Sequence, residues 1–285
     1  MQALIDRWRA HLVHEGSTRA VALMRIGFVL LVWSRYADEI LPFRHRGWDW
    51  WLLVPAFFVA TTAMLFGVQT RLATVATACV LATMYGVFGW LGGHEPWVHH
   101  HTYLLNIGVV WLALTPCGRS FSVDRWRAVR HAEITGAEPP PERGPLWAVP
   151  LLAAQCSAVY LWSAVDKTNV RFLSGDQLES ILMHFYSGSE PVSVPGFATV
   201  CLVASVFVVL VEYVLPVALF VRRWHPWVVL FAMLFHGVLY VAIPVGTFTL
   251  TMWVYFLAYV DPEAVHRFVD QLTGRPYATS GLTPR

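Results

Sequence analysis

Apolar residues gather in long runs along this chain, and polar residues collect between the runs. A membrane-spanning helix needs about 20 mostly apolar residues, because only a helix satisfies its own backbone hydrogen bonds inside hydrocarbon. The segments that approach this length and composition are 20–38, 48–67, 72–92, 101–116, 146–165, 197–221, 226–243 and 246–260. The pattern therefore predicts an all-α, polytopic transmembrane bundle of about eight spans, of which the fourth, seventh and eighth are short or interrupted.

Three polar segments are expected to lie outside the hydrocarbon. Residues 3–14 have the arginines and tryptophan typical of an amphipathic helix at the membrane interface. Residues 138–145 (EPPPERGP) are predicted to form a loop, because their prolines break helical hydrogen bonding. Residues 175–189 have a helical pattern but are too polar to span, so a short helix near the membrane surface is expected. The first apolar run begins near Arg19 with no small-residue cleavage site after it, which indicates a retained span.

The composition supports a membrane protein. Hydrophobic residues make up 56% of the chain, charged residues make up 13%, and the mean hydropathy is +0.52. A soluble domain has about 25% charged residues, so this chain has too little polar surface to face water, and lipid is its expected partner. The net charge of +2 gives no reason to expect a nucleic-acid partner. We interpret residues 1–285 as a single transmembrane domain whose four cysteines are buried apolar residues.

Basic residues are distributed unevenly over the predicted loops. With eight spans and a cytoplasmic N-terminus, fourteen basic residues fall inside and four fall outside. Cytoplasmic loops usually carry the excess of positive charge. The sequence therefore predicts a protein of the cell membrane with both termini in the cytoplasm. On this topology Lys167, His184 and the histidines at 99–101 lie toward the outer side.

Several polar residues fall within the predicted spans. Placing an ionisable side chain in hydrocarbon is energetically unfavourable, so each is a functional candidate by default. Glu212 lies among apolar residues, so it is either paired or held protonated, and a structural pair with Arg25 is one alternative. His236 lies in the seventh span, and a histidine in a buried helix is more often a hydrogen-bonded packing residue than a ligand. Asn106 and Gln155 add uncharged polar groups to the fourth and fifth spans.

The stretch HEPWVHHH (94–101) is rich in metal-binding residue types. However, Pro96 interrupts helical spacing between His94 and the later histidines, and three consecutive histidines point in different directions. We therefore predict no metal site, and we expect one of the three histidines to have a functional role.

Lys167 is the only lysine, beside 19 arginines, and it follows the fifth predicted span. The ordinary explanation is a lysine that extends to the membrane interface. Alternatively, burial disfavours the charged form of a lysine, and a neutral amine can serve as a general base. Asp166 is adjacent, so the two side chains diverge on a helix and do not face each other.

Three stretches resemble the membrane region of the vitamin K-dependent gamma-glutamyl carboxylases and their bacterial relatives, the HTTM (horizontally transferred transmembrane domain) proteins. They are HHHTYLLNIGVVWLAL with SFSVDRW (99–126), YLWSAVDKTNVRFLSGDQL with MHFYS (160–187), and FHGVLYVAIPVGTFTLTMWVYFLAY (235–259). The first is similar to the family's N-H-S-Y-L segment and later S-V-D, and the second to its lysine-bearing helix end. The third resembles the family's last membrane segment. The similarity extends over most of the chain, at low identity but in the same order and spacing.

The resemblance implies roles for individual residues. Lys167 matches the lysine assigned as the catalytic base, and His101 matches the histidine of N-H-S-Y-L, which is implicated in catalysis. His184 matches the histidine after the lysine helix, and His236 matches one near the last membrane segment. The expected catalytic residues are Lys167, His101 and His184, and the expected substrate-binding residues are His100, His236, Asn106 and Glu212.

The resemblance also implies a reaction. The neutral lysine deprotonates a reduced naphthoquinone, such as menaquinol or vitamin K hydroquinone, and O2 and CO2 are co-substrates. Epoxidation of the quinone then generates the base that allows a glutamate side chain to be carboxylated. Asp166 stands where the family has the first lysine of a pair, and His100 stands where it has an asparagine. The large extracytoplasmic region by which animal carboxylases hold a protein substrate has no counterpart here, so the membrane chemistry is expected to act on another substrate, and a peptide substrate is the alternative that the resemblance implies.

The leading interpretation is therefore a carboxylase-like membrane enzyme, a lyase or quinol oxygenase, with Lys167 as its base. Two alternatives stay open. One is an intramembrane terpene or prenyl cyclase on the same fold that uses a protonated Glu212. The other is a non-catalytic quinone- or lipid-binding membrane subunit whose polar residues join its helices.

Overall fold

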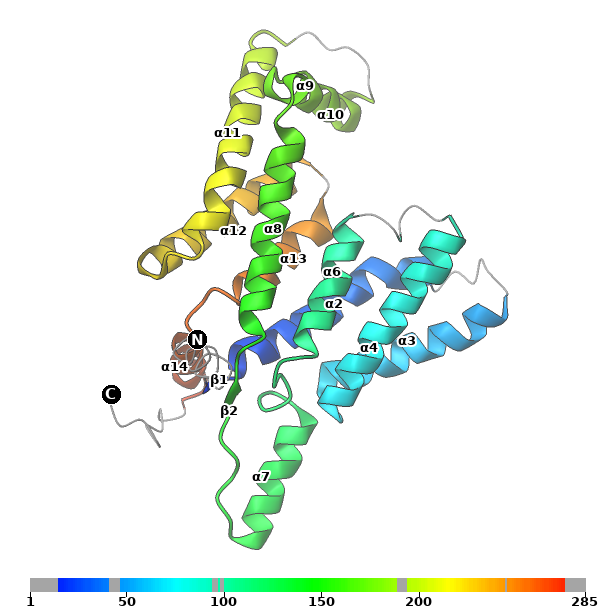
Figure 1. Ribbon diagram of the computed structural model, residues 1–285, viewed down its shortest axis with the longest axis vertical. Coiled ribbons are helices and arrows are strands. Elements are labelled where there is room, and N and C mark those ends of the chain that lie inside the picture. Colours follow the sequence, from blue (N-terminus) through cyan, green and yellow to red (C-terminus); the bar gives the residue numbers. More distant parts are fainter. Residues whose placement is uncertain are drawn as a thin grey trace, which may run out of the picture. The chain divides into compact units, whose positions relative to one another are not determined.

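The computed structural model describes residues 15–40, 47–93, 97, 100–188, 194–243 and 245–274, and these residues are mostly helical (Figure 1). The prediction of an all-α fold is confirmed. Strands β1 (Glu15–Ser17) and β2 (Arg143–Pro145) form one short antiparallel pair, with Gly16 opposite Gly144. The chain divides into two compact units, Met1–Leu152 with Val260–Arg285, and Ala153–Tyr259. The prediction of a single domain stays a prediction.

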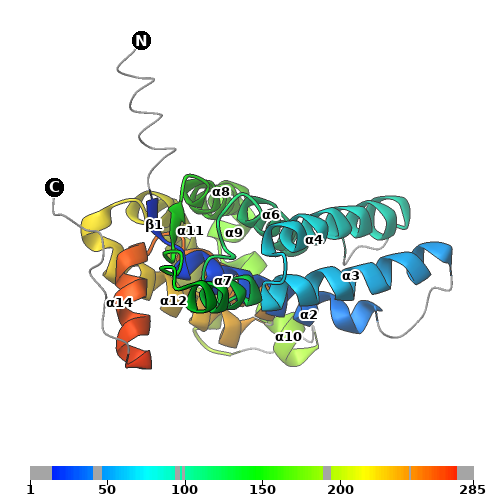
Figure 2. The same ribbon diagram turned by 90° about the horizontal axis from the view of Figure 1, so that it is seen from below.

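The first unit contains the early helices and the last one. Its helices are α2 (Arg19–Ile40), α3 (Trp48–Phe66), α4 (Thr70–Met84) with the π-helix η1 (Tyr85–Leu91), α6 (His100–Leu112), α7 (Val123–Thr135) and α14 (Pro262–Thr273). α3 and α4 lie side by side in both views (Figure 1, Figure 2). α2 packs against α3 and α6, and α4 packs against α6.

Gly67 allows the tight turn between α3 and α4. Its φ of 66° is left-handed, and its N–H donates to the carbonyls of Ala63 and Met64 at the end of α3. A Cβ at this position would lie 2.4 Å from the Ser122 Cβ and 2.9 Å from an Arg25 nitrogen. Glycine is therefore required both by the backbone conformation and by the close approach of these side chains.

The second unit is built from α8 onward. Its helices are α8 (Val149–Lys167), which begins in the first unit, α9 (Val170–Leu173), α10 (Asp176–Ser187), α11 (Phe197–Ala218), the 3₁₀ turn η2 (Arg222–Trp224), α12 (His225–Ala242) and α13 (Gly246–Phe256). α11 packs against α10 and α12, and α12 packs against α13. α10 confirms the predicted short, non-spanning helix near 175–189.

The structure supports four of the eight predicted spans. In the described part of the chain, the segments that are long and apolar enough to cross a membrane are Arg19–Ala37, Thr70–Leu91, Phe197–Ala218 and Arg222–Ala242. α3 contributes a shorter apolar stretch, Trp51–Phe66. The prediction of eight spans is therefore wrong for the described residues.

Two physical reasons explain why α6, α13 and α8 are not among the candidate spans. α6 has 13 residues and α13 has 11, which at about 1.5 Å per residue is roughly 20 and 17 Å, short of a hydrocarbon core of about 30 Å. α8 is longer, but Gln155, Asp166 and Lys167 dilute its apolar character. The cytoplasmic termini and the outer position of Lys167 were inferred from eight spans, so they stay predictions. The predicted interfacial helix at 3–14 lies outside the described residues.

Three of the four cysteines match the expectation of buried apolar residues. Cys117, Cys156 and Cys201 are buried, whereas Cys79 is exposed.

A polar cluster joins the start of α2 to α14 within the first unit. Arg19 is 6% exposed and makes ion pairs of 2.6 Å with both Glu142 and Asp270. It also donates to the backbone carbonyl of His266, whose ring lies 2.9 Å from the Ser17 hydroxyl. The buried guanidinium is the nearest cation to both carboxylates, which also have longer contacts, Glu142 with Arg125 at 3.6 Å and Asp270 with His266 at 3.4 Å.

We expect Arg19→Ala to lower the free energy of unfolding by about 3–5 kcal/mol, because both carboxylates lose their 2.6 Å ion pair with a buried cation and keep only longer contacts. Thermal unfolding of the purified protein in detergent measures the effect. Arg130→Ala is the matched control, since the Arg130–Glu133 pair is exposed and such pairs contribute about 0–1 kcal/mol. Equal losses in the two variants would contradict a special role for Arg19.

His266 predicts a loss of stability in mild acid. Burial, and then the charge of Arg19, lower the pKa of His266 below its ordinary value. The unfolded chain therefore binds the proton first, so stability is complete above pH about 6.5 and declines as the pH falls below it. His266→Gln should unfold at a temperature that depends less on pH between about 7.5 and 5.5. His131→Gln changes an exposed histidine and should behave as wild type; identical pH dependence in all three proteins would refute the assignment.

Candidate active site

One face of α8 carries the polar side chains of the second unit. Tyr160, Ser163 and Lys167 are separated by three and four residues, a spacing that places them on the same side of a helix. Lys167 is the last residue of α8, where the helix dipole favours a cation. The chain then turns at Asn169, whose side chain accepts a hydrogen bond from the N–H of Phe172 and caps α9.

Lys167, Ser163 and Glu212 form a closed polar cluster. The Lys167 Nζ lies 2.8 and 2.9 Å from the two carboxylate oxygens of Glu212 on α11. It also donates to the Ser163 hydroxyl, which in turn donates to Glu212 Oε1 at 3.0 Å. The Glu212 side chain is 8% exposed and the Lys167 side chain is 27% exposed. The carboxylate is therefore enclosed, whereas the lysine side chain stays partly exposed.

The position of Glu212 in α11 explains why it needs this partner. It is the only charged residue in a 22-residue apolar helix, and an unpaired carboxylate there would be very unfavourable. Pro216 lies four residues later and has no N–H to donate to the backbone carbonyl of Glu212. The Glu212 carboxylate and a missing backbone hydrogen bond thus lie in the same turn of α11.

An aromatic ring lies close to the Lys167 amine. The Lys167 Nζ lies 5.9 Å from the centre of the Phe172 ring, within the range of a cation–π contact. Phe172 is 5% exposed, so it closes one side of the amine against water.

His236 has a partner on the same face of α8. The Tyr160 hydroxyl and His236 Nε2 are 2.6 Å apart, and both residues are buried. The rings of Phe235, Phe248 and Phe256 lie 5.5–6.0 Å from the imidazole. His236 Nδ1 has no hydrogen-bond partner among the described residues. A packing role therefore accounts for Nε2 but not for Nδ1.

The other predicted site residues lie elsewhere in the chain. His184 is exposed on α10, with its ring 5.4 Å from that of Phe185. In the first unit, His100 begins α6 and His101 follows it, half-buried. Asn106 on the same helix is buried and accepts a 2.8 Å hydrogen bond from the Tyr36 hydroxyl. Of the predicted residues, the structure brings Lys167 and Glu212 into direct contact.

The suggested pairing of Arg25 with Glu212 is replaced by other contacts. Arg25 is fully buried and donates to the backbone carbonyls of Cys117 and Phe121, at 2.6 and 2.5 Å. Glu212 is occupied by Lys167 and Ser163. Each charged group thus finds its partners within its own unit, although Arg25 Nε has no hydrogen-bond partner among the described residues.

Sequence reasoning missed Ser163 and Tyr160. Their helical spacing from Lys167 was a usable signal, because residues three, four and seven positions apart share a helix face. Within the described part of the chain, no group of three or more His, Cys, Asp or Glu side chains is placed to hold a metal ion. His94 and His99 lie outside the described residues.

The cluster is suited to moving one proton. With the proton on Lys167, the amine and the carboxylate form an ion pair; with the proton on Glu212, both groups are neutral. The pair has no net charge in either state, so the change requires little rearrangement of surrounding charge. In the second state, the Lys167 amine has a lone pair and can accept a proton from another molecule.

These features define an all-helical membrane protein with four candidate spans among the described residues and a partly buried lysine–carboxylate pair. The HTTM domain model matches residues 38–263, so the chain belongs to the HTTM family. The match includes Lys167, Glu212 and His236, and it confirms the HTTM resemblance and, in general terms, a relation to the vitamin K-dependent carboxylases. Neither a curated protein nor a solved structure matches the chain.

A double-mutant cycle tests the Lys167–Glu212 contact. We expect Lys167→Met and Glu212→Gln each to lower the unfolding temperature, and the double variant to lose less than the sum. A coupling free energy of about 1–3 kcal/mol is expected for two residues in direct contact. The same cycle on Arg130 and Glu133, an exposed pair, should give at most about 0.5 kcal/mol. Additive effects at Lys167 and Glu212 would show that the two side chains are not coupled.

Proposed function

We propose that this HTTM protein is a membrane enzyme in which Lys167 acts as a general base on a lipid-soluble substrate, a reduced naphthoquinone. The observation that supports this proposal is the partly exposed Lys167 side chain, whose amine is held 2.8 Å from the enclosed Glu212 carboxylate. A base needs a lone pair and access to its substrate, and in this proposal Glu212 provides the first by accepting a proton. Glu212 takes up the proton of Lys167, and the exposed part of Lys167 faces the incoming group.

The paired arrangement fits the deprotonation of a weak acid. When the neutral amine takes a proton from a hydroxyl group, it becomes an ammonium beside the anion that it has produced. The ammonium and the anion then attract each other in surroundings of low dielectric constant, which stabilises the product of the transfer. Ser163 holds the Lys167 amine and one oxygen of Glu212 in position throughout.

The substrate class follows from the location and from the family relation. A reduced naphthoquinone is apolar enough to reside in the bilayer, and it carries a weakly acidic aromatic hydroxyl. Its oxidation by O2 balances as quinol plus O2 giving quinone epoxide plus water. Carboxylation of a glutamate side chain by CO2 would be a further stage, and it rests on the relation to the carboxylases alone. A peptide substrate belongs to that stage.

The remaining residues have supporting roles in this proposal. His236 lies beside Tyr160 on the face of α8 that carries Lys167, and its unpartnered Nδ1 is suited to orienting a substrate oxygen. His101 and His184 are assigned to catalysis on the family relation, and His100 and Asn106 are assigned to substrate binding as polar residues of the same segment. The Asn106 oxygen already accepts a hydrogen bond from Tyr36, which leaves its amide N–H groups as donors.

The contacts of Glu212 weigh against the prenyl cyclase alternative. A cyclase acid must carry a proton that it can give to an alkene. Glu212 instead accepts three hydrogen bonds, from Lys167 and Ser163, so its oxygens are directed at these two side chains. A quinone-binding subunit without catalysis is distinguished from the enzyme by the experiment below.

The test is turnover of a short-chain menaquinol by the purified full chain in nanodiscs. Wild type with O2 should form the quinone epoxide, detected by mass spectrometry with label from isotopic O2. Lys167→Ala should reduce the rate by about 10²–10⁴-fold, the range for loss of a general base. Glu212→Gln should lower the rate and shift its pH profile, because the amine then has no carboxylate to receive its proton.

Asp166→Asn is the matched control, because Asp166 is adjacent to Lys167 but exposed and on another face of α8. It should retain the wild-type rate. Absence of epoxide from wild type, under conditions in which a family carboxylase turns over, would refute the proposal. Tight quinone binding without product would identify a binding subunit, and product from a prenyl substrate that depends on Glu212 but not Lys167 would identify a cyclase.

A further inference from the structure

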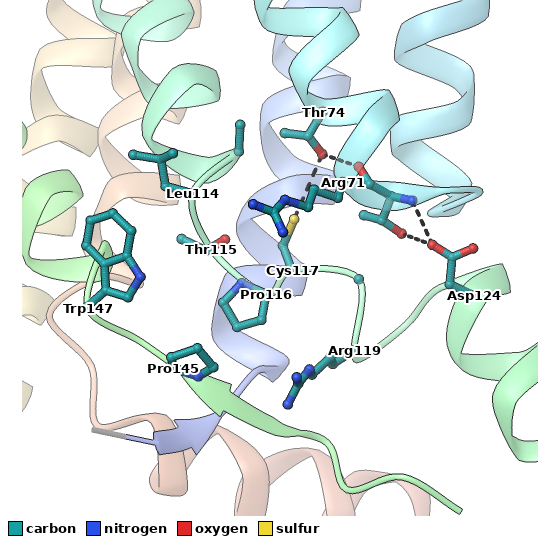
Figure 3. A pocket seen from close by; sticks show the side chains of 13 residues that line it. Arg71, Thr74, Leu114, Thr115, Pro116, Cys117, Arg119, Asp124, Pro145 and Trp147 are labelled. Carbon is teal, nitrogen blue, oxygen red and sulfur yellow. Dashed lines mark hydrogen bonds between the residues drawn. The ribbon is translucent and has the colours of Figure 1, made fainter. Parts of the chain in front are cut away.

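The first unit contains a cavity of about 500 Å³ (Figure 3). It is lined by the start of α4, the segment that links α6 to α7, and the residues around Pro145. In the view of Figure 3, Leu114 and Trp147 lie on one side of this cavity, and Arg71 and Arg119 lie on the other. The proposed catalytic cluster belongs to the second unit, so this cavity has no part in it.

The cavity lies at the level where two candidate spans begin. Thr70 and Arg71, which line it, are the first residues of the span Thr70–Leu91. Cys117 also lines it, and its carbonyl accepts a hydrogen bond from Arg25, near the start of the span Arg19–Ala37. Helices of this kind begin at the boundary between hydrocarbon and headgroups. The cavity therefore lies beside the beginning of one candidate span and is in contact, through Cys117, with a second.

Two arginines give the cavity an unbalanced positive charge. Arg71 and Arg119 are both exposed, and neither makes an ion pair within the residues that the structure describes. Arg119 uses one nitrogen to donate to the backbone carbonyl of Arg143, which holds its side chain in place. A guanidinium offers five N–H donors, so most of the donors of both arginines are available to an anion.

Asp124 is the acidic residue of the cavity lining, and its oxygens are already occupied. They accept from the N–H groups of Gln69 and Thr70 and from the Thr70 hydroxyl, at 2.6–2.9 Å. Burial alone would raise the pKa of Asp124, but these hydrogen bonds outweigh it and lower the pKa. Asp124 therefore stays ionised and serves to cap α4, and the cavity retains one net positive charge from its arginines and this carboxylate.

The opposite side of the cavity is apolar. Leu114 is 43% exposed and Trp147 is 36% exposed, and Pro116 and Pro145 also line the cavity. A free inorganic anion would gain nothing from this surface. A molecule with an anionic group next to hydrocarbon would contact both sides at once.

We infer that this cavity binds an anionic phospholipid of the surrounding membrane. The phosphate lies between Arg71 and Arg119, whose planar donor groups match phosphate oxygens. The glycerol and the first acyl carbons lie against Leu114 and Trp147. Bound lipid would join α4 to the α6–α7 segment and stabilise the first unit.

The experiment uses the delipidated full chain in a neutral detergent. Short-chain phosphatidylglycerol, short-chain phosphatidylcholine and inorganic phosphate are added separately, and the unfolding temperature is followed against concentration. We expect phosphatidylglycerol to raise the unfolding temperature at concentrations at least about tenfold lower than the other two, since binding to the folded state stabilises it. The Arg71→Gln/Arg119→Gln variant should need at least about tenfold more phosphatidylglycerol for the same rise.

Arg222→Gln/Arg223→Gln is the matched control, because it removes two exposed arginines at the start of another span. It should respond to phosphatidylglycerol as wild type does. Arg71→Lys/Arg119→Lys keeps the charges but loses the planar fork, so it should bind with intermediate strength, and it serves if the glutamine variant does not fold. Equal stabilisation by the two lipids, an unchanged response in the glutamine variant, or full stabilisation by inorganic phosphate alone would overturn the inference.

Discussion

A charge that enters an apolar helix must be compensated by another group, and this requirement shapes both units of the protein. In the second unit, Glu212 is the only charged residue of α11, and Lys167 at the end of α8 compensates it. In the first unit, the fully buried Arg25 is compensated by the backbone carbonyls of Cys117 and Phe121. One solution is an ion pair that can exchange a proton, and the other is a fixed set of dipoles.

The difference between these solutions matters for function. Backbone carbonyls have no proton to give or take, so the contacts of Arg25 shape the segment from Cys117 to Phe121 and nothing more. The Lys167–Glu212 pair has two protonation states of equal net charge, which makes it suited to acid–base chemistry beside an apolar substrate. The Lys167 side chain is 27% exposed and the Glu212 side chain is 8% exposed, so Lys167 is the more accessible member of the pair.

Hydrophobic periodicity and hydropathy predict some features of this fold and miss others. The all-α class, the short helix near 175–189 and four of the spans follow directly from local patterns. The count of eight failed because an apolar run does not show where a helix ends. The predicted span 101–116, for example, ends as a helix at Leu112, and its last residues turn toward Cys117, whose carbonyl binds Arg25.

The sequence by itself determined that this is a helical membrane protein of the HTTM type and that Lys167 stands alone as its lysine, because composition and local order are one-dimensional properties. Only the tertiary structure decided that Glu212 pairs with Lys167 rather than Arg25, that Asn106 binds Tyr36, and that His236 binds Tyr160. These partners are 45 to 76 residues apart in the chain. Which helix faces meet depends on how the side chains of whole helices pack, and hydrophobic periodicity identifies a buried face without identifying the helix that covers it.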